Sequence, residues 1–384
     1  MKTGTQFQQM TAWARTTLRD IGSTWYKWID PAPGGNPCPE VPHAVLRVWT
    51  DDRDAPYIAA GREGGRQFVR DMLARWRECP WATCYELANE PDCNSGKGLA
   101  NLREYSIGAM MEADLHGIKV CILNLPEGNP GADPGLTGEA ARQSERWKLE
   151  QLAEAVKHAC DHGHYVGLHA YWNPAVAPDG PADRWHGLGR VVWNVEQWAL
   201  MGVDLSKLQL LVGECGVDGA LEGGAYEGWI RYYGHDYNAY ADEMHKAEMY
   251  AGQYPWMKAL LYFISGPYPG WDTYEVDERL LRTAAAGIAR LPAPAEEAPM
   301  LGPDPNVLYY HSDRHGYKPQ WLIIHDTEGP AVAALTWWRS PSNPYKSSAH
   351  YLVTSDSKVV AVVPERLAAH HAGGGKWPGI PDGS

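Results

Sequence analysis

Short apolar runs recur along residues 1–290 of the chain, separated by stretches with helical periodicity. The runs are residues 24–29, 44–50, 83–88, 118–123, 165–171, 208–213 and 259–264. They are apolar on both faces and rich in β-branched or aromatic residues, which is typical of parallel strands buried on both sides. Helical patterns lie between them, for example at residues 64–77, 145–158 and 239–250. This alternation predicts a (β/α) barrel or an open doubly wound sheet.

The number of apolar runs bears on how the sheet closes. Seven strands are predicted, and residues 5–20 are predicted to form a helix before the first of them. A complete barrel of this kind has eight strands, so we expect its first strand to be missing from the chain. The alternative is that the first strand is formed differently. No G-x-G-x-x-G sequence follows the first predicted strand, which counts against a dinucleotide-binding sheet.

The periodic pattern stops at residues 291–305, where the sequence LPAPAEEAPMLGPDP is rich in Pro, Ala and Glu. This composition predicts an extended, semi-rigid linker. The pattern then restarts with a strand at residues 321–325, a helix at 331–339 and a hairpin formed by 349–354 and 359–363. We therefore predict three parts, namely a barrel over residues 1–290, a linker over 291–305 and a smaller α+β domain over 306–384.

Composition and charge narrow the possible partners. The 384 residues carry a net charge of −13 and no run of Lys or Arg, which argues against nucleic acid. No apolar stretch is long enough to span a membrane, and no signal peptide is visible, so the sequence assigns no compartment. The seven scattered cysteines predict reduced, buried thiols. The 18 Trp and 21 Tyr, against 3 Phe, favour a surface that stacks on sugar rings.

Two glutamates stand where predicted strands end. The sequence ELANEPD places Asn89 and Glu90 after one strand, and LLVGECG places Glu214 after another. A charged residue at the end of a buried strand is costly unless it is paired or functional. The carboxyl ends of barrel strands form the catalytic face. A carboxylic acid and a carboxylate that meet on that face are the two groups that glycoside hydrolysis requires.

The NEP triplet at residues 89–91, with a second glutamate three strands later, resembles clan A of the glycoside hydrolases, the cellulase-like superfamily. The resemblance implies a (β/α)8, or TIM, barrel that needs no cofactor. It also implies a retaining mechanism with Glu90 at strand four as acid/base and Glu214 at strand seven as nucleophile. The strand numbers agree only if strand one is absent.

A further set of residues is predicted to contact the substrate. They are Asn89 beside the acid/base, Arg47 and Trp49 at the third strand, His169 and Tyr171 at the sixth, and Trp271 beyond the eighth. His169 is equally well interpreted as a hydrogen-bonded core histidine. Trp271 is a loose match, because the clan usually has a Trp within strand eight. Glu86 is expected to be a supporting or surface carboxylate.

The C-terminal part carries a second resemblance. The sequence WLIIHDTEG places His325 after a strand, residues 349–364 form a hairpin motif with Ser357 where glycine is usual, and a His-Ala-Gly segment follows at 371–373. These segments resemble the N-acetylmuramoyl-L-alanine amidases related to peptidoglycan recognition proteins. The resemblance implies Zn²⁺ with His325 as its first ligand. The other two ligands have no counterpart in the sequence, so we expect a truncated domain that binds zinc weakly or not at all.

Together these features predict a modular cell-wall hydrolase similar to endolysins. A retaining glycosidase and part of a zinc amidase would act on the glycan and the stem peptide of peptidoglycan. One alternative is a barrel that binds glycan without cutting it, attached to an amidase whose catalytic half is absent. A second alternative is a glycosidase for plant polysaccharides.

Overall fold

The computed structural model describes residues 1–50, 54–172, 186–222, 226–267 and 269–288, and beyond them the backbone of four short strands. The chain divides into two compact units, Met1–Leu291 and Pro292–Ser384. All the long strands and helices of the described residues belong to the first unit.

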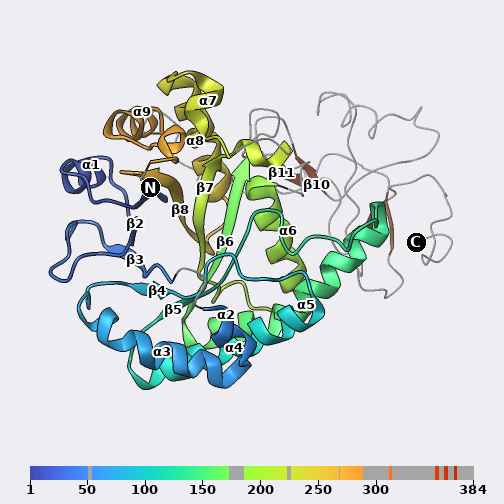
Figure 1. The fold of residues 1–384 in the computed structure, drawn as a ribbon. Helices are drawn as coiled ribbons and strands as arrows, with labels where there is room; N and C mark the ends of the chain where they lie inside the picture. The colour runs from blue at the N-terminus through green and yellow to red at the C-terminus, as the bar shows by residue number, and fades with distance from the viewer. Residues whose placement is uncertain are drawn as a thin grey trace, which may run out of the picture. The chain divides into compact units, whose positions relative to one another are not determined.

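Eight parallel strands of the first unit close into a barrel (Figure 1). They are β1 (Thr3–Phe7), β2 (Trp25–Ile29), β3 (His43–Arg47), β4 (Cys84–Glu86), β5 (Val120–Leu125), β6 (Tyr165–Trp172), β7 (Leu210–Val217) and β8 (Met257–Ser265). Each strand pairs with the next, and β8 pairs with β1. The predicted α/β barrel is confirmed, and the seven predicted strands are β2 to β8 in order.

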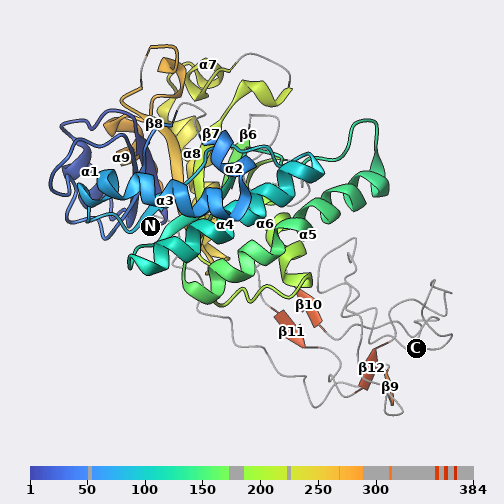
Figure 2. The same ribbon diagram turned by 60° about the horizontal axis from the view of Figure 1, so that its bottom comes forward.

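Helices cover the outside of the barrel (Figures 1 and 2). They are α1 (Ala14–Asp20), α2 (Ala55–Ala59), α3 (Gly61–Arg77), α4 (Gly96–Leu115), α5 (Gly138–His162), α6 (Gly187–Leu200), α7 (Trp229–Tyr233), α8 (Tyr237–Gly252) and α9 (Glu278–Ile288). Two 3₁₀ turns, η1 (Gly219–Glu222) and η2 (Asp272–Tyr274), follow β7 and β8. The three helices predicted from periodicity are confirmed within α3, α5 and α8.

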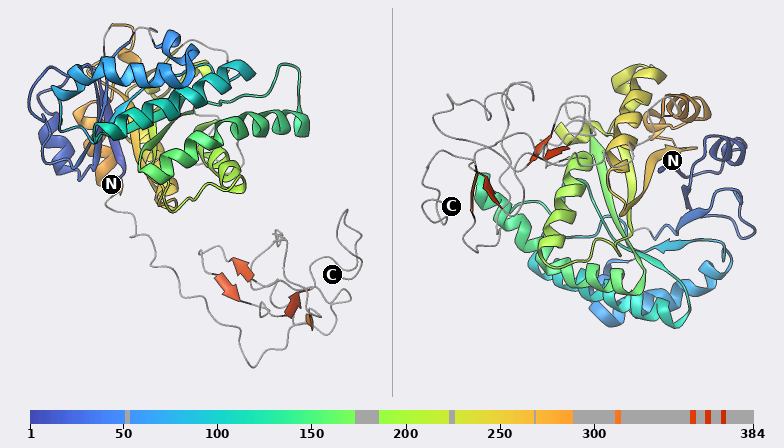
Figure 3. Two further views of the ribbon diagram at one scale, coloured as in Figure 1. Left: turned by 90° about the horizontal axis from the view of Figure 1, so that it is seen from below. Right: turned by 180° about the vertical axis from the view of Figure 1, so that it is seen from behind.

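Local signals begin and end several of these helices. The Ser95 side chain accepts a hydrogen bond from the Gly98 amide at the start of α4, and Asp236 caps α8 in the same way. Gly163 ends α5 with a left-handed backbone. Figure 3 shows α3 in blue, α4 in teal and α5 in green following one another around the strands.

The first strand of the barrel is present, so the expectation that it is missing is wrong. Thr3–Phe7 forms β1, and only the second half of the helix predicted there is helical, as α1. The sequence TGTQF hides this strand because its buried positions are mostly polar. Gly4 is needed because a Cβ there would lie 2.1 Å from the Trp25 carbonyl oxygen. The Thr5 hydroxyl pairs with Ser265 Oγ at 2.8 Å, so hydrogen bonds compensate for the missing apolar side chains.

The barrel interior has two layers, because alternate residues of a strand point to the same face. The apolar layer, toward the amino ends of the strands, consists of Trp25, Val45, Cys84, Cys121, Tyr165, Leu211, Ala259 and Leu261. Two residues further along β2, β3 and β4 stand Lys27, Arg47 and Glu86, all buried. Charged side chains therefore fill the barrel directly above the apolar layer.

Two other sequence predictions concern the cysteines and the possibility of a membrane-spanning helix. All seven cysteines are free and buried, as predicted. Among the described residues, no helix combines the length and the apolar character needed to cross a membrane.

In the second unit, the described strands form two antiparallel pairs. β10 (Tyr351–Val353) pairs with β11 (Val359–Ala361), and β9 (His311–Asp313) pairs with β12 (Leu367–Ala369). The first pair confirms the predicted hairpin. The predicted linker at 291–305, the strand at 321–325, the helix at 331–339 and His325 lie outside the described residues.

Candidate active site

A cluster of four charged side chains fills the barrel above the apolar layer, and we call it the ionic layer. It consists of Lys27 on β2, Arg47 on β3, Glu86 on β4 and Glu214 on β7. Lys27 Nζ lies 2.7 Å from Glu86 Oε2 and 3.5 Å from Glu214 Oε1. Arg47 Nη1 lies 3.2 Å from Glu214 Oε1, and Arg47 Nε lies 3.7 Å from Glu86 Oε1. None of the four side chains is more than 8% exposed.

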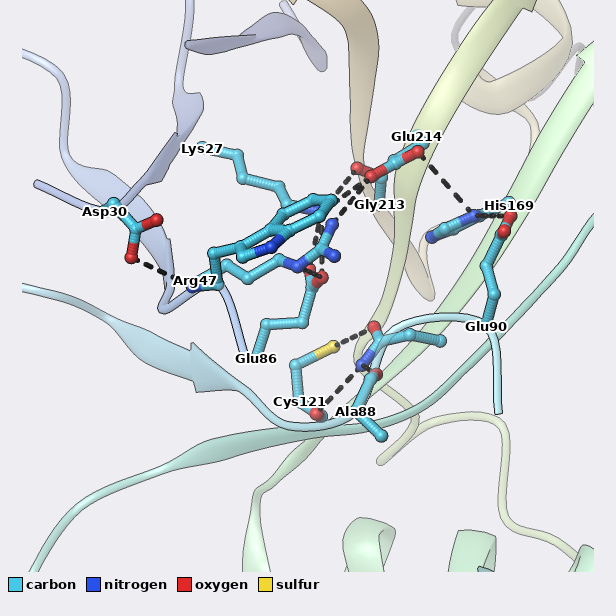
Figure 4. Close-up of polar contacts among 12 residues, drawn as sticks. Lys27, Asp30, Arg47, Glu86, Ala88, Glu90, Cys121, His169, Gly213 and Glu214 are labelled. Atoms are coloured by element: carbon cyan, nitrogen blue, oxygen red, sulfur yellow. Dashed lines mark hydrogen bonds and ion pairs between the residues drawn. The ribbon is translucent and has the colours of Figure 1, made fainter. Parts of the chain in front are cut away.

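Glu90 reaches the same place from the loop after β4. Its backbone has a left-handed φ of 47°, and its amide donates to the Asn124 carbonyl oxygen at 3.1 Å. Nδ1 of the buried His169 lies 2.9 Å from Glu90 Oε1 and 3.9 Å from Glu214 Oε2. Figure 4 shows His169 and Glu90 on one side of Glu214, and Lys27, Arg47 and Glu86 on the other. The structure thus brings the two predicted catalytic glutamates together around one imidazole ring.

Glu214 lies inside a strand, not at its end. The apolar run suggests that β7 ends at Gly213, but β7 continues to Val217. The register toward β6 shifts so that Gly213 is skipped and His169 pairs with Glu214. Such a bulge re-aims a side chain without ending the strand, which is why an inward carboxylate is compatible with continued pairing. The Gly213 carbonyl oxygen accepts a hydrogen bond from Lys27 Nζ at 3.2 Å.

The surroundings of Glu214 favour its ionised form. Burial by itself raises the pKa of this carboxyl, but His169, Lys27 and Arg47 lower it, as does the Tyr171 hydroxyl, which donates to Oε2 at 3.0 Å. The net effect lowers the pKa of Glu214 to about 2. Glu214 is therefore a carboxylate at any pH at which the protein is expected to work.

The predicted substrate residues next to these glutamates line the same end of the barrel. Trp49 is 46% exposed, and the Arg47 guanidinium lies over its ring at 5.1 Å. The Trp49 amide donates to Asp30 Oδ1 at 2.9 Å. Asn89 is half-buried, and among the described residues its Oδ1 atom has no hydrogen-bond partner. Trp49 thus presents an exposed ring beside Arg47, whereas Asn89 Oδ1 is a buried acceptor without a partner in the described part of the chain.

Trp271 is brought to the site through an aromatic cluster. Its half-buried ring lies 5.3 Å from Phe263 of β8, which in turn lies 6.3 Å from Tyr171. Tyr274 packs against both Phe263 and Trp271. Trp271 is therefore connected to Tyr171 through the Phe263 ring.

Lys27 is a functional candidate that the sequence prediction missed. Glu86 is predicted to be a supporting or surface carboxylate, and the structure places it in the barrel interior, 2% exposed and paired with Lys27. The signal was present in WYKWI, where a lysine interrupts an apolar strand two residues after Trp25. A lone buried lysine is costly, so its presence in a core strand implies a carboxylate partner on a neighbouring strand.

Among the described residues, no group of three or more His, Cys, Asp and Glu side chains is arranged to hold a metal ion. His325 lies outside them and remains a predicted zinc ligand.

Residues 315–380 match the sequence model of the N-acetylmuramoyl-L-alanine amidase family. This match covers the segment whose motifs resemble that family. A search of curated proteins gave no match.

Several solved barrels resemble this chain. An endo-beta-1,3-glucanase from Amycolatopsis mediterranei in complex with laminaripentaose is 14% identical, with 75% of this chain and 100% of that chain covered and a TM-score of 0.42. The beta-glucuronidase of Bifidobacterium dentium is 12% identical, with coverages of 76% and 47% and a TM-score of 0.44. A family 5 xyloglucanase from Paenibacillus pabuli is 11% identical, with coverages of 75% and 98% and a TM-score of 0.41.

Proposed function

We propose that the barrel is a retaining glycoside hydrolase in which Glu214 is the nucleophile and Glu90 is the acid/base. The observation that carries this proposal is the meeting of the two carboxylates at His169, above the ionic layer. Glu214 is buried among cations, whereas the Glu90 side chain is 42% exposed. Two carboxyl groups in such different surroundings suit the two roles of a retaining mechanism.

The reaction then proceeds in two steps. The Glu214 carboxylate attacks the anomeric carbon while Glu90 gives its proton to the departing glycosidic oxygen. Glu90, now a carboxylate, takes a proton from water, which attacks the same carbon and releases Glu214. The Tyr171 hydroxyl and Arg47 hold the two oxygens of Glu214, and His169 holds Glu90. These contacts keep the reacting groups in place through both steps.

The proposed substrate is a β-linked glycan, held by the residues predicted for this purpose: Asn89, Arg47, Trp49, His169, Tyr171 and Trp271. The exposed ring of Trp49 offers an apolar face to a sugar. Asn89, next to Glu90, has a side-chain oxygen that is buried in this structure and unpaired among the described residues. The amidase match favours peptidoglycan over a plant polysaccharide, because the two modules would then act on one polymer. Zn²⁺ is proposed only for a complete amidase domain, in which His325 would be one ligand, and the barrel is proposed to need no cofactor.

The stereochemistry of the first product tests the proposal. The full chain is incubated with peptidoglycan, a β-1,3-glucan and cello-oligosaccharides, and the anomeric protons are followed by NMR before mutarotation. We expect the β-anomer to appear first, with peptidoglycan as the preferred substrate, and Glu214→Gln to form no product. An α-anomer appearing first would contradict retention. Glycan binding without any product would favour the non-catalytic barrel instead.

A further inference from the structure

Lys27 is the most deeply buried charge of the barrel interior. Its side chain is 0% exposed, and Glu86, its nearest partner at 2.7 Å, is 1% exposed. Burying an ion pair costs several kcal/mol per ion, and apolar side chains of similar volume often serve stability equally well. The residues two positions earlier on the same strands, Trp25 and Cys84, are apolar. The fold therefore does not by itself require a charged pair at this level of the barrel.

The ammonium group of Lys27 lies between Glu86 and the Glu214 segment of β7. Its ammonium group donates to Glu86, lies 3.5 Å from Glu214 Oε1, and donates to the Gly213 carbonyl oxygen at the bulge of β7. One cation thus touches both the carboxylate of Glu214 and the peptide unit before it. Glu86 holds this cation from the opposite side, and it also lies 3.7 Å from Arg47 Nε.

We propose that Lys27 and Glu86 form a positioning pair that fixes the bulge at Gly213 and sets the ionisation of the Glu214 nucleophile. The proposal rests on the function proposed for Glu214. Glu86 fixes Lys27 between strands, and Lys27 holds the Glu214 carboxylate where it meets the substrate. Lys27 acts on the reaction only through Glu214 Oε1, and Glu86 acts only through Lys27.

The charges of the ionic layer determine in which direction the pKa of Glu214 moves when Lys27 or Glu86 is replaced. The ionic layer contains two cations and two carboxylates, so its formal charge is zero. Without Lys27, Arg47 faces two carboxylates alone, and the pKa of Glu214 rises. Without Glu86, two cations face Glu214, and its pKa does not rise. Without both, Arg47 and Glu214 remain as a neutral pair, and most of the rise is reversed.

Charged and titratable side chains on several elements lie near Glu214 and influence its pKa. They are Lys27 from β2, Arg47 from β3, Glu86 from β4, Glu90 from the loop after β4, and His169 and Tyr171 from β6. All except Lys27 and Glu86 are unchanged in the variants below, so differences between variants report on this pair.

The test compares Lys27→Met, Glu86→Gln and the double variant in the full chain. The Glu214 carboxyl is titrated by NMR of ¹³C-glutamate-labelled protein, assigned with Glu214→Gln, and the acid limb of kcat/KM is measured in parallel. We expect the Glu214 midpoint to rise by about 1–3 pH units in Lys27→Met. We expect no rise in Glu86→Gln and reversal of most of the shift in the double variant. Lys27→Gln, which keeps a hydrogen-bonding group near Gly213, is a second variant with the same expected rise.

Lys148→Met is the matched control. Lys148 on α5 is only 2% exposed and pairs with Asp133 at 2.9 Å, outside the barrel interior. This variant removes an equally buried ammonium group and should leave the titration of Glu214 unchanged.

Two outcomes overturn the proposal: a Glu214 midpoint that Lys27→Met and Lys27→Gln do not move, or a shift that the double variant does not reverse. The NMR titration needs no substrate, so failure of the glycosidase function is seen separately. An inactive wild-type chain with the expected NMR shifts would contradict the glycosidase and leave the positioning pair intact. A normal acid limb and midpoint in every variant, with activity present, would contradict the pair alone.

Discussion

The apolar layer and the ionic layer of the barrel are built from the same strands, two residues apart. On β2 the inward positions carry Trp25 and then Lys27, and on β4 they carry Cys84 and then Glu86. The apolar layer removes side chains from water, which stabilises the fold. The ionic layer buries charges, which costs free energy unless each charge is paired. The strands thus fix where side chains point, while stability and chemistry are divided between the two ends of the barrel.

The largest effect expected in the ionic layer comes from Glu214→Ala. Removing the nucleophile should lower kcat/KM by at least about 10³-fold, because no other group can form the covalent intermediate. Azide should restore part of the turnover of an activated aryl glycoside by entering the space of the lost carboxylate. The product is then a glycosyl azide of inverted configuration, which NMR identifies. Glu150→Ala, on the exposed face of α5, is the control and should be as active as the wild type.

Glu90→Ala should have a smaller effect that depends on the leaving group. Loss of a positioned general acid costs about 10²–10⁴-fold when the leaving group needs a proton. An activated aryl glycoside does not need that proton, so its first step should be almost unaffected. The measurement is kcat/KM over a series of aryl glycosides with different leaving-group pKa values. Equal losses for Glu90→Ala across the series would contradict the acid/base role.

Leu261→Ala tests the apolar layer. Leu261 on β8 is fully buried, so the variant should lower the free energy of unfolding by about 2–5 kcal/mol. We expect kcat/KM of the folded protein and its acid limb to stay near wild type, because the cavity lies in the layer that carries no chemistry. Urea unfolding followed by circular dichroism gives the stability. Leu261→Met keeps the volume of the side chain and should lower the free energy of unfolding by less than about 1.5 kcal/mol. A shifted acid limb of kcat/KM in Leu261→Ala would contradict the proposed division between the layers.

The apolar layer is also the part that could be predicted from the sequence. The strands β2 to β8 were found because buried parallel strands are continuous apolar runs, a property of each strand alone. β1 was missed because its buried positions hold Thr, Gly and Gln in place of apolar residues. The Thr5 hydroxyl is satisfied by the Tyr262 carbonyl oxygen and Ser265 Oγ of β8. These contacts join residues that are distant in the sequence. The segment TGTQF contains no local pattern that would predict these contacts.

The ionic layer could be predicted only in part. Glu90 and Glu214 were recognisable because each follows an apolar run, and the structure brings both to His169. Lys27 and Glu86 were not recognised as a pair, because 59 residues separate them and their contact depends on strand order. The bulge at Gly213 was also missed, since a skipped residue between β6 and β7 leaves no trace in the hydrophobic pattern.

The smallest expected effect concerns how the two ends of the barrel respond to acid. His164, just before β6 at the amino end, is fully buried, and its Nδ1 accepts a hydrogen bond from the Val120 amide at 3.2 Å. Burial, together with Lys119, lowers the pKa of His164 to about 4, against the attraction of Asp114. The native state therefore binds fewer protons here than the unfolded state, and stability falls as the pH drops from about 6.5 toward 4.

Loss of the Glu214 charge also lowers the stability of the protein as the pH falls, but in a lower pH range than for His164. Its pKa is lowered to about 2, so its stabilising contribution is present above about pH 4.5 and is lost as the pH falls toward 2. We therefore expect the amino end of the barrel to weaken before the ionic layer does. For His164 the expected loss between pH 7 and pH 5 is about 2 kcal/mol.

His164→Asn tests this order, because the asparagine side chain keeps an acceptor for the Val120 amide but does not titrate. The drop in the free energy of unfolding between pH 7 and pH 5 should be about 2 kcal/mol smaller than in the wild type, measured by urea unfolding at both pH values. His235→Asn is the control, because His235 is exposed and its left-handed backbone, with φ of 63°, suits asparagine. If both variants lose stability with pH as the wild type does, His164 is not the group through which acid first weakens the barrel.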